Sequence, residues 1–183
     1  MKKNQMTLSL LVDNNPGVLS RISGLFSRRG YNIESITAGL TQDEKYSRIT
    51  VVASGEDLVL EQIRKQISKL VDVRKIITMK QEESVCRELM LVKVGVNKKE
   101  KQEVIAIANI FRANIVDVSS DSLMMELTGN LTKLDAFLGL LQDFEIKEMV
   151  RTGITALSRG ACEGTIRPDD PDEIDWIINV DEY

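Results

Sequence analysis

The sequence predicts an α+β fold made of two tandem ferredoxin-like units, each with the element order βαββαβ. Two observations lead to this prediction. Segments in which apolar and polar residues alternate, as in half-buried strands, are interleaved with segments whose apolar residues recur at helical spacing. The complete order then occurs a second time beyond the polar stretch 80–84, which indicates an internal repeat of one supersecondary unit.

The first unit is expected to span residues 6–80. In chain order, its predicted elements are a strand over 6–12, a helix that begins at Val18 and stops at Gly30, strands over 31–40 and 46–53, a helix that begins within 54–57, and a strand over 71–79. The apolar stripes that predict the two helices are Val18, Ile22, Leu25 and Phe26, and Leu60, Ile63, Ile67 and Leu70. The polar loop 41–45 is either a solvated hairpin or a contact surface for a partner protein.

The second unit is expected to span residues 85–160. In chain order, its predicted elements are a strand over 89–96, a helix carrying Val104, Ile107, Ala108 and Phe111, strands over 114–118 and 123–127, a helix carrying Leu134, Phe137, Leu138 and Leu141, and a strand over 146–150. Residues 161–183 follow as an acidic C-terminal extension. This extension either solvates the protein or docks through Ile174, Trp176, Ile177 and Ile178.

The composition is that of an ordinary globular protein, with 43% hydrophobic and 28% charged residues in 183. No apolar run approaches the ~20 residues that span a membrane, and the start carries no signal-peptide pattern. Cys86 and Cys162 stand far apart, without neighbouring cysteines, in a chain that has no histidine, so neither a metal site nor a redox pair is indicated. We therefore expect a cytoplasmic protein without a membrane segment.

Histidine is absent from the chain. The usual general base at neutral pH, the Ser-His and Cys-His nucleophile systems and the commonest metal ligand are therefore missing. This absence argues against an independent enzyme. The net charge of −4, with the acidic residues concentrated at the C-terminal end, likewise argues against a nucleic-acid-binding surface.

The join between the first strand and the first helix is the strongest candidate for a ligand site. Asn14-Asn15-Pro16-Gly17 forms a turn that aims free backbone N–H groups at the start of a helix, where anions bind. Gly17 lets a ligand approach the backbone, and the amides of Asn14 and Asn32 offer both donors and acceptors. Such a pocket suits an amino acid, although an ordinary strand–turn–helix join without a ligand has the same spacing. The second unit has a charged join over 96–101 without the Pro-Gly turn, so the equivalent pocket is not expected there.

The residues DNNPGVLSRISGLFSRRGYNIESI at 13–36 resemble the opening of an ACT domain, and specifically that of the small, regulatory subunits of acetolactate synthase (acetohydroxyacid synthase). Further matching words are LEQIRKQISKLVDV at 60–73, RELMLVKV at 87–94, FRANIVDVS at 111–119, LTKLDAFL at 131–138 and RTGITALSRG at 151–160. The resemblance thus runs from about Met6 to Gly160 and identifies the first unit as an ACT domain. From Ala161 onward the chain departs from the family pattern.

The resemblance implies a site and partners. In the family, Asn14, Gly17 and Asn32 match residues that hold a branched-chain amino acid, usually valine, between the ACT domains of two subunits. The effector-binding residues that we predict are Asn14, Pro16, Gly17, Val18, Leu19, Asn32, Ile33 and Ile36. Of the apolar members, Leu19 and Ile36 could equally be core. Thiamine diphosphate, FAD and magnesium would belong to the large catalytic subunit, and this chain would bind none of them.

The function implied is that of a non-catalytic subunit, a homodimer through its ACT domains. It would activate the large subunit of acetolactate synthase and mediate feedback inhibition in valine, leucine and isoleucine biosynthesis. A free-standing ACT-type amino-acid sensor, serving another enzyme or a transcription factor, is the alternative. A ferredoxin-like enzyme or an RNA-binding module is disfavoured, because histidine and an aromatic, basic strand are both missing.

Overall fold

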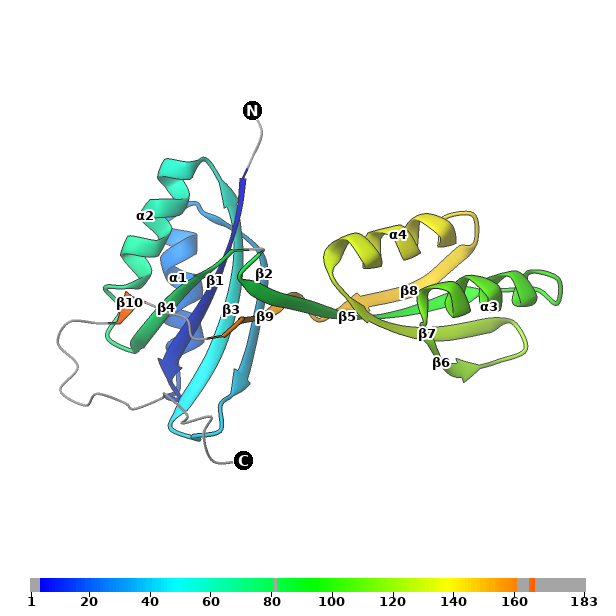
Figure 1. Cartoon of the computed structure of the whole chain (residues 1–183), viewed down its shortest axis with the longest axis horizontal. Helices are drawn as coiled ribbons and strands as arrows, with labels where there is room; N and C mark the ends of the chain where they lie inside the picture. Colours follow the sequence, from blue (N-terminus) through cyan, green and yellow to red (C-terminus); the bar gives the residue numbers. More distant parts are fainter. Residues whose placement is uncertain (1–3, 81, 161–164, 167–183) are drawn as a thin grey trace.

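A computed structural model describes residues 4–80, 82–160 and 165–166 and has the predicted fold class (Figure 1). Two antiparallel sheets, each packed against two helices, form two successive α+β units. Within the described residues the elements are β1 (Asn4–Asp13), α1 (Val18–Arg29), β2 (Asn32–Leu40), β3 (Tyr46–Gly55), α2 (Asp57–Ile67), β4 (Val73–Met79), β5 (Ser84–Gly95), α3 (Glu100–Phe111), β6 (Asn114–Val118), β7 (Ser122–Gly129), α4 (Leu131–Leu141), β8 (Glu145–Arg151), β9 (Thr155–Ser158) and β10 (Thr165–Ile166). The predicted βαββαβ order is confirmed in both units.

The first unit contains a sheet in the order β10-β4-β1-β3-β2, with every neighbouring pair antiparallel. One face packs against α1 and α2, because alternate strand residues and every third or fourth helix residue are apolar and share one core. Buried members of this core include Leu8, Leu10, Ile22, Phe26, Val51, Ile63 and Ile67. Each contributes about 1.5–3 kcal/mol by leaving water, so the core holds α1 firmly along its length.

The second unit repeats this arrangement with the strand order β6-β7-β5-β8 and with α3 and α4 against one face. Its buried residues include Met90, Val92, Val94, Val104, Leu123, Met125, Leu134, Phe137 and Leu141. The rings of Phe111 and Phe137 lie 5.3 Å apart between the two helices, within the range of favourable aromatic pairs.

The connection between the units differs from the prediction. The strand predicted to start at Leu89 starts at Ser84, because residues 84–87 pair with β9, a strand that the sequence did not predict. The later part of β5 pairs with β7 and β8. β5 therefore runs as one strand from the first unit into the second, where a polar linker was expected over 80–84 (Figure 1).

A smaller correction concerns the second helix. Leu70 was predicted to continue its apolar stripe, but α2 ends at Ile67. Leu70 lies in the following turn, where its N–H donates to the Ile67 carbonyl at 3.0 Å, and its side chain still packs against the first core. The next strand accordingly begins at Val73 and not at Val71.

The acidic extension predicted over 161–183 lies outside the described residues, except for β10, whose backbone pairs with Lys75 and Ile76 of β4. The docking segment predicted around Trp176 lies outside them as well. Across the described part of the chain, no helix has the length and apolar character needed to cross a membrane.

Candidate functional site

The turn between β1 and α1 leaves backbone donors open. Gly17 occupies the N-cap position in the left-handed region, with φ at +86°, and no side chain caps the helix. The Val18 N–H donates to the Asn15 carbonyl at a long 3.3 Å. Within the described residues, the next two N–H groups, of Leu19 and Ser20, have no acceptor. The start of α1 therefore presents free donors and the positive end of the helix dipole to solvent.

The helices of the second unit begin differently. The side-chain oxygen of Asn97 accepts from the N–H groups of Lys99 and Glu100 at 2.8 and 3.0 Å, and Glu100 accepts from the Asn97 N–H in return. This reciprocal capping consumes the donors that an anion would need. Asn130 caps α4 in the same way, by accepting from the Lys133 N–H at 2.9 Å. The open turn of the first unit therefore has no counterpart in the second.

A cation beside this turn was missed by the sequence analysis. A Cβ placed on Gly17 would lie 3.4 Å from Nη1 of Arg21, so the guanidinium borders the open N–H groups. Arg21 donates twice to Asp72, at 2.7 Å each. These hydrogen bonds lower the pKa of Asp72 and raise the pKa of Arg21. The signal that could have revealed Arg21 is its position four residues after Gly17, on the same side of the first helical turn.

Asn14 ties the same turn to the loop between β2 and β3. Its backbone N–H donates to the Lys45 carbonyl at 2.7 Å, and its side-chain N–H donates to the Glu44 carbonyl at 2.9 Å. Its side-chain oxygen accepts from the Ser47 hydroxyl at 3.0 Å. Since a carbonyl oxygen carries two lone pairs, Asn14 can serve as a structural anchor and still accept once from a ligand.

Asn32 lies exposed at the start of β2, beside a carboxylate that the sequence analysis did not single out. Its side-chain N–H donates to Oε1 of Glu34 at 2.7 Å, and the same oxygen accepts from the Ser54 hydroxyl. Glu34 sits at an irregularity in the β2–β3 register, between Ile33 and Ser35. The alternation of the strand therefore did not indicate where the Glu34 carboxylate lies, which is a further acceptor for an ammonium group.

The two halves of the predicted site lie at opposite ends of the first sheet. Asp13, which precedes the turn, pairs with Tyr46, whereas Asn32 pairs with Ser54, eight positions further along β3. That separation corresponds to roughly 26 Å at ~3.3 Å per strand residue. The helix α1 connects the two ends and spans about 18 Å over its 12 residues. One chain therefore does not bring Gly17 and Asn32 together.

The predicted apolar walls divide into core and surface. Val18 is 4% exposed and belongs to the first core, and Ile33 and Ile36 are half-buried against it. Leu19 is 46% exposed, and Pro16 is exposed as well. The suggestion that Leu19 is core is therefore wrong, and its side chain is free to contact a ligand or another chain.

The described residues were expected to hold no metal site, since the chain lacks histidine. No group of three or more histidine, cysteine, aspartate or glutamate side chains there could hold a metal ion. The ionic contacts of the first unit include pairs that join its strands and helices, such as Arg74 with Asp13 at 2.8 Å. The turn at Gly17 presents N–H donors beside a cation, and the start of β2 presents amide and carboxylate acceptors.

Comparisons with known proteins cover both units. Residues 8–75 match the family model of the AHAS small subunit-like ACT domain, and residues 87–160 match that of the small subunit of acetolactate synthase. The chain is 50% identical over 162 residues to the probable acetolactate synthase small subunit of Methanothermobacter thermautotrophicus, covering 88% of this chain and 96% of the relative. It is 49% identical over 160 residues to the acetolactate synthase small subunit of Mycobacterium bovis, covering 87% and 95%.

A solved structure has the same architecture. The crystal structure of the acetolactate synthase small subunit from Thermotoga maritima superposes with a TM-score of 0.79 at 40% identity, over 87% of this chain and 99% of that one. The matched family segments include the turn around Gly17, the start of β2 and the return strand β9.

Proposed function

This chain belongs to the family of acetolactate synthase small subunits, and we propose that it acts as a non-catalytic regulatory subunit. In this proposal it binds and activates the large catalytic subunit and carries feedback inhibition by a branched-chain amino acid, valine first among them. Thiamine diphosphate, FAD and magnesium would reside on the large subunit. The chain itself would work in the cytoplasm without a cofactor.

The observation that carries the proposal is the separation of the two half-sites. Each chain has an open helix start at Gly17 and an acceptor pair at Asn32 and Glu34, at opposite ends of one sheet. β2 is an edge strand, since among the described residues it pairs with β3 alone. The free N–H and C=O groups of an edge strand can pair with a strand of another chain.

Antiparallel pairing of two β2 edges across a twofold axis would bond their free N–H and C=O groups and would also bring the two kinds of half-site together. The start of one β2 would lie beside the end of the other, so Asn32 of the partner subunit would approach the end of the sheet that holds Gly17. A twofold interface repeats every contact. The homodimer would therefore have two equivalent effector sites, each built from both subunits.

The chemistry of the completed site matches an α-amino acid. The carboxylate would accept from the N–H groups of Leu19 and Ser20, with Arg21 and the helix dipole adding favourable charge. The ammonium would donate to the side-chain oxygen of Asn32 and to Glu34, both from the partner subunit. The exposed side chain of Leu19 would contact an aliphatic side chain, which favours a branched-chain amino acid over a polar one.

The alternative is an ACT-type sensor that regulates another enzyme or a transcription factor. Two measurements separate it from the proposal. Calorimetric titration of the purified chain with valine, leucine and isoleucine should give saturable binding near one ligand per chain. Adding the chain to the large subunit should raise acetolactate synthase activity and make it sensitive to the same amino acid, while the chain alone should have none. Amino-acid binding without any effect on the large subunit would favour the alternative.

A further inference from the structure

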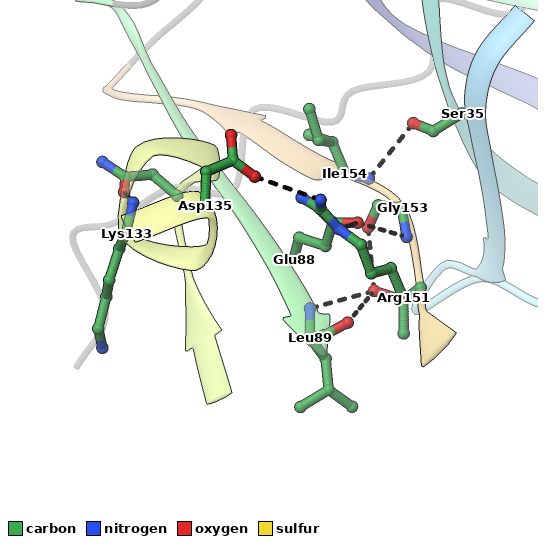
Figure 2. Close-up of polar contacts among 10 residues, drawn as sticks. Ser35, Glu88, Leu89, Lys133, Asp135, Arg151, Gly153 and Ile154 are labelled. Atoms are coloured by element: carbon green, nitrogen blue, oxygen red, sulfur yellow. Dashed lines mark hydrogen bonds and ion pairs between the residues drawn. The ribbon is translucent and has the colours of Figure 1, made fainter. Parts of the chain in front are cut away.

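The segment between β8 and β9 joins the second unit to the strand that carries half of the proposed effector site (Figure 2). The Thr37 hydroxyl donates to the Ile154 carbonyl at 2.9 Å. The Ile154 N–H donates to the Ser35 hydroxyl oxygen at 3.4 Å. Ser35 and Thr37 belong to the edge strand β2. Ile154 belongs to the segment 152–154, which we name the joint.

Gly153 packs tightly in this joint, and a side chain there would crowd its neighbours. Its φ is +84°, a region that L-residues rarely adopt. A Cβ at this position would lie 3.1 Å from Cβ of Ser35 and 3.3 Å from Cγ2 of Thr37. The backbone of the joint therefore lies directly against β2, and a displacement of either one has to move the other.

The joint is equally fixed to the second unit. The Thr152 N–H donates to the Leu89 carbonyl at 3.0 Å, and the Leu89 N–H donates to the Thr152 hydroxyl oxygen at 3.1 Å. The Gly153 N–H donates to Oε1 of Glu88 at 3.2 Å. Because Leu89 and Glu88 belong to β5, an inner strand of the second sheet, a movement of the joint is passed to that sheet.

Apolar packing reinforces the contact. Ile154 and Ala156 pack with Val52 and Met79, on the face of the first sheet opposite its helices. This small core is separate from the two large ones, and it forms only where the two units meet. The joint is therefore a packed connection, in contrast to a flexible linker, which would leave the units independent.

We propose that the joint couples effector occupancy at β2 to the second unit. β2 carries residues of both kinds: Asn32, Ile33 and Ile36 belong to the predicted effector set, and Ser35 and Thr37 hold the joint. A ligand or partner strand that shifts β2 shifts the joint, and through β5 the whole second sheet. This inference rests on the proposed function, and it names the route by which that function is regulated.

Gly153→Ala tests the coupling, and Gly160→Ala is its matched control. Both glycines have positive φ, at +84° and +60°, but among the described residues a Cβ at Gly160 meets nothing within 4 Å. Backbone strain is thus common to both variants, and only Gly153→Ala disturbs Ser35 and Thr37. Valine affinity of the full chain should stay within about twofold in both, because the atoms nearest a Cβ at Gly153 belong to Ser35 and Thr37, which are outside the predicted effector set. The valine concentration for half-inhibition of the reconstituted enzyme should rise about tenfold or more in Gly153→Ala alone.

Two milder variants test the same contact in case Gly153→Ala does not fold. Thr37→Val keeps the shape of the side chain but removes the hydrogen bond to Ile154, whereas Thr37→Ser keeps the donor. The coupling predicts weakened inhibition with normal valine binding in Thr37→Val and near-normal inhibition in Thr37→Ser. Unchanged inhibition in both Gly153→Ala and Thr37→Val overturns the inference. So does a parallel loss of valine binding, since the joint would then be part of the binding site.

Amide hydrogen exchange of the full chain without ligand separates failure of the inference from failure of the proposed function. Gly153→Ala should speed exchange across residues 32–40, and Gly160→Ala should not. If the wild-type chain binds no branched-chain amino acid but this exchange pattern holds, the proposed function fails and the coupling stands. If exchange over 32–40 is the same in both variants and the wild type, the coupling fails whatever the ligand results.

Discussion

Glu88 and Arg151 form a two-point ion pair at the base of the second sheet, with hydrogen bonds of 3.0 and 2.8 Å. The side chain of Glu88 is only 6% exposed, and its Oε1 also accepts from the Gly153 N–H. Arg151 keeps a second, weaker partner in Asp135 at 3.3 Å. One buried carboxylate therefore holds both the end of β8 and the joint.

The first prediction concerns stability. Glu88→Ala leaves Arg151 short of its main partner and the Gly153 N–H without an acceptor, so we expect a loss of about 3 kcal/mol in the free energy of unfolding. This loss lies at the low end of the range for breaking a buried ion pair, because Asp135 still pairs with Arg151 in the variant. Urea unfolding followed by circular dichroism measures it. Glu61→Ala, which removes a surface partner of Arg64 within one helix, is the control and should cost far less. Equal losses in the two variants would contradict this account.

The second prediction concerns pH. The hydrogen bonds from Arg21 lower the pKa of Asp72 below its ordinary value, and the charge of Arg74 acts in the same direction. A carboxyl whose pKa is lower in the folded state stabilises the fold above its unfolded-state pKa of about 4. That contribution is lost as the pH falls through the folded-state pKa. It is modest, because Arg21 is half exposed and salt screens the pair.

Urea midpoints measured from pH 5 down to pH 2 test this expectation. The wild-type midpoint should fall more steeply than that of Asp72→Asn, which has no carboxyl to protonate. Arg21→Gln should flatten the profile in the same way, because it removes the cause of the lowered pKa. A profile for Asp72→Asn that runs parallel to the wild type would show that the pair adds no pH dependence.

Most of the fold was predictable because its signals are local. The alternation of apolar residues over 6–12 and the helical stripe from Val18 to Phe26 report burial on one face, whatever the rest of the chain does. The strand β9 was not predictable in this way. It has four residues and is a strand because it pairs with the start of β5, about 70 positions earlier in the chain. The joint escaped prediction for the same reason.

The candidate site was predictable in its parts but not in its arrangement. The turn at Gly17 follows from Pro-Gly turn chemistry, and Asn32 from its place before a strand. That the two lie at opposite ends of a sheet depends on strand register, which no local pattern specifies. Glu34 escaped attention because the register irregularity beside it breaks the alternation from which side-chain direction is inferred.

The third prediction tests the helix start. Gly17→Asp should abolish valine binding and feedback inhibition while leaving activation of the large subunit largely intact, because its carboxylate would repel that of the ligand. Gly17→Asn is the matched variant, since it has the same size and backbone strain without the charge. It should retain measurable binding by calorimetry. Equal binding in Gly17→Asp and wild type would mean that the carboxylate lies elsewhere.

The last prediction tests whether each site is built from two subunits. Asn32→Ala should weaken valine binding by roughly 1–3 kcal/mol, the cost of an unpaired buried partner, and Gly17→Asp should remove binding, so neither homodimer has an intact site. A mixed dimer of the two variants, isolated through two different affinity tags, distributes the two substitutions over its sites differently from either homodimer. If Gly17 of one chain acts with Asn32 of its partner, one site regains both native residues while the other has both substitutions. Calorimetry should then show one site of wild-type affinity per mixed dimer. If each site lay within a single chain, every site would still carry one of the two substitutions, and mixing would restore no site of wild-type affinity.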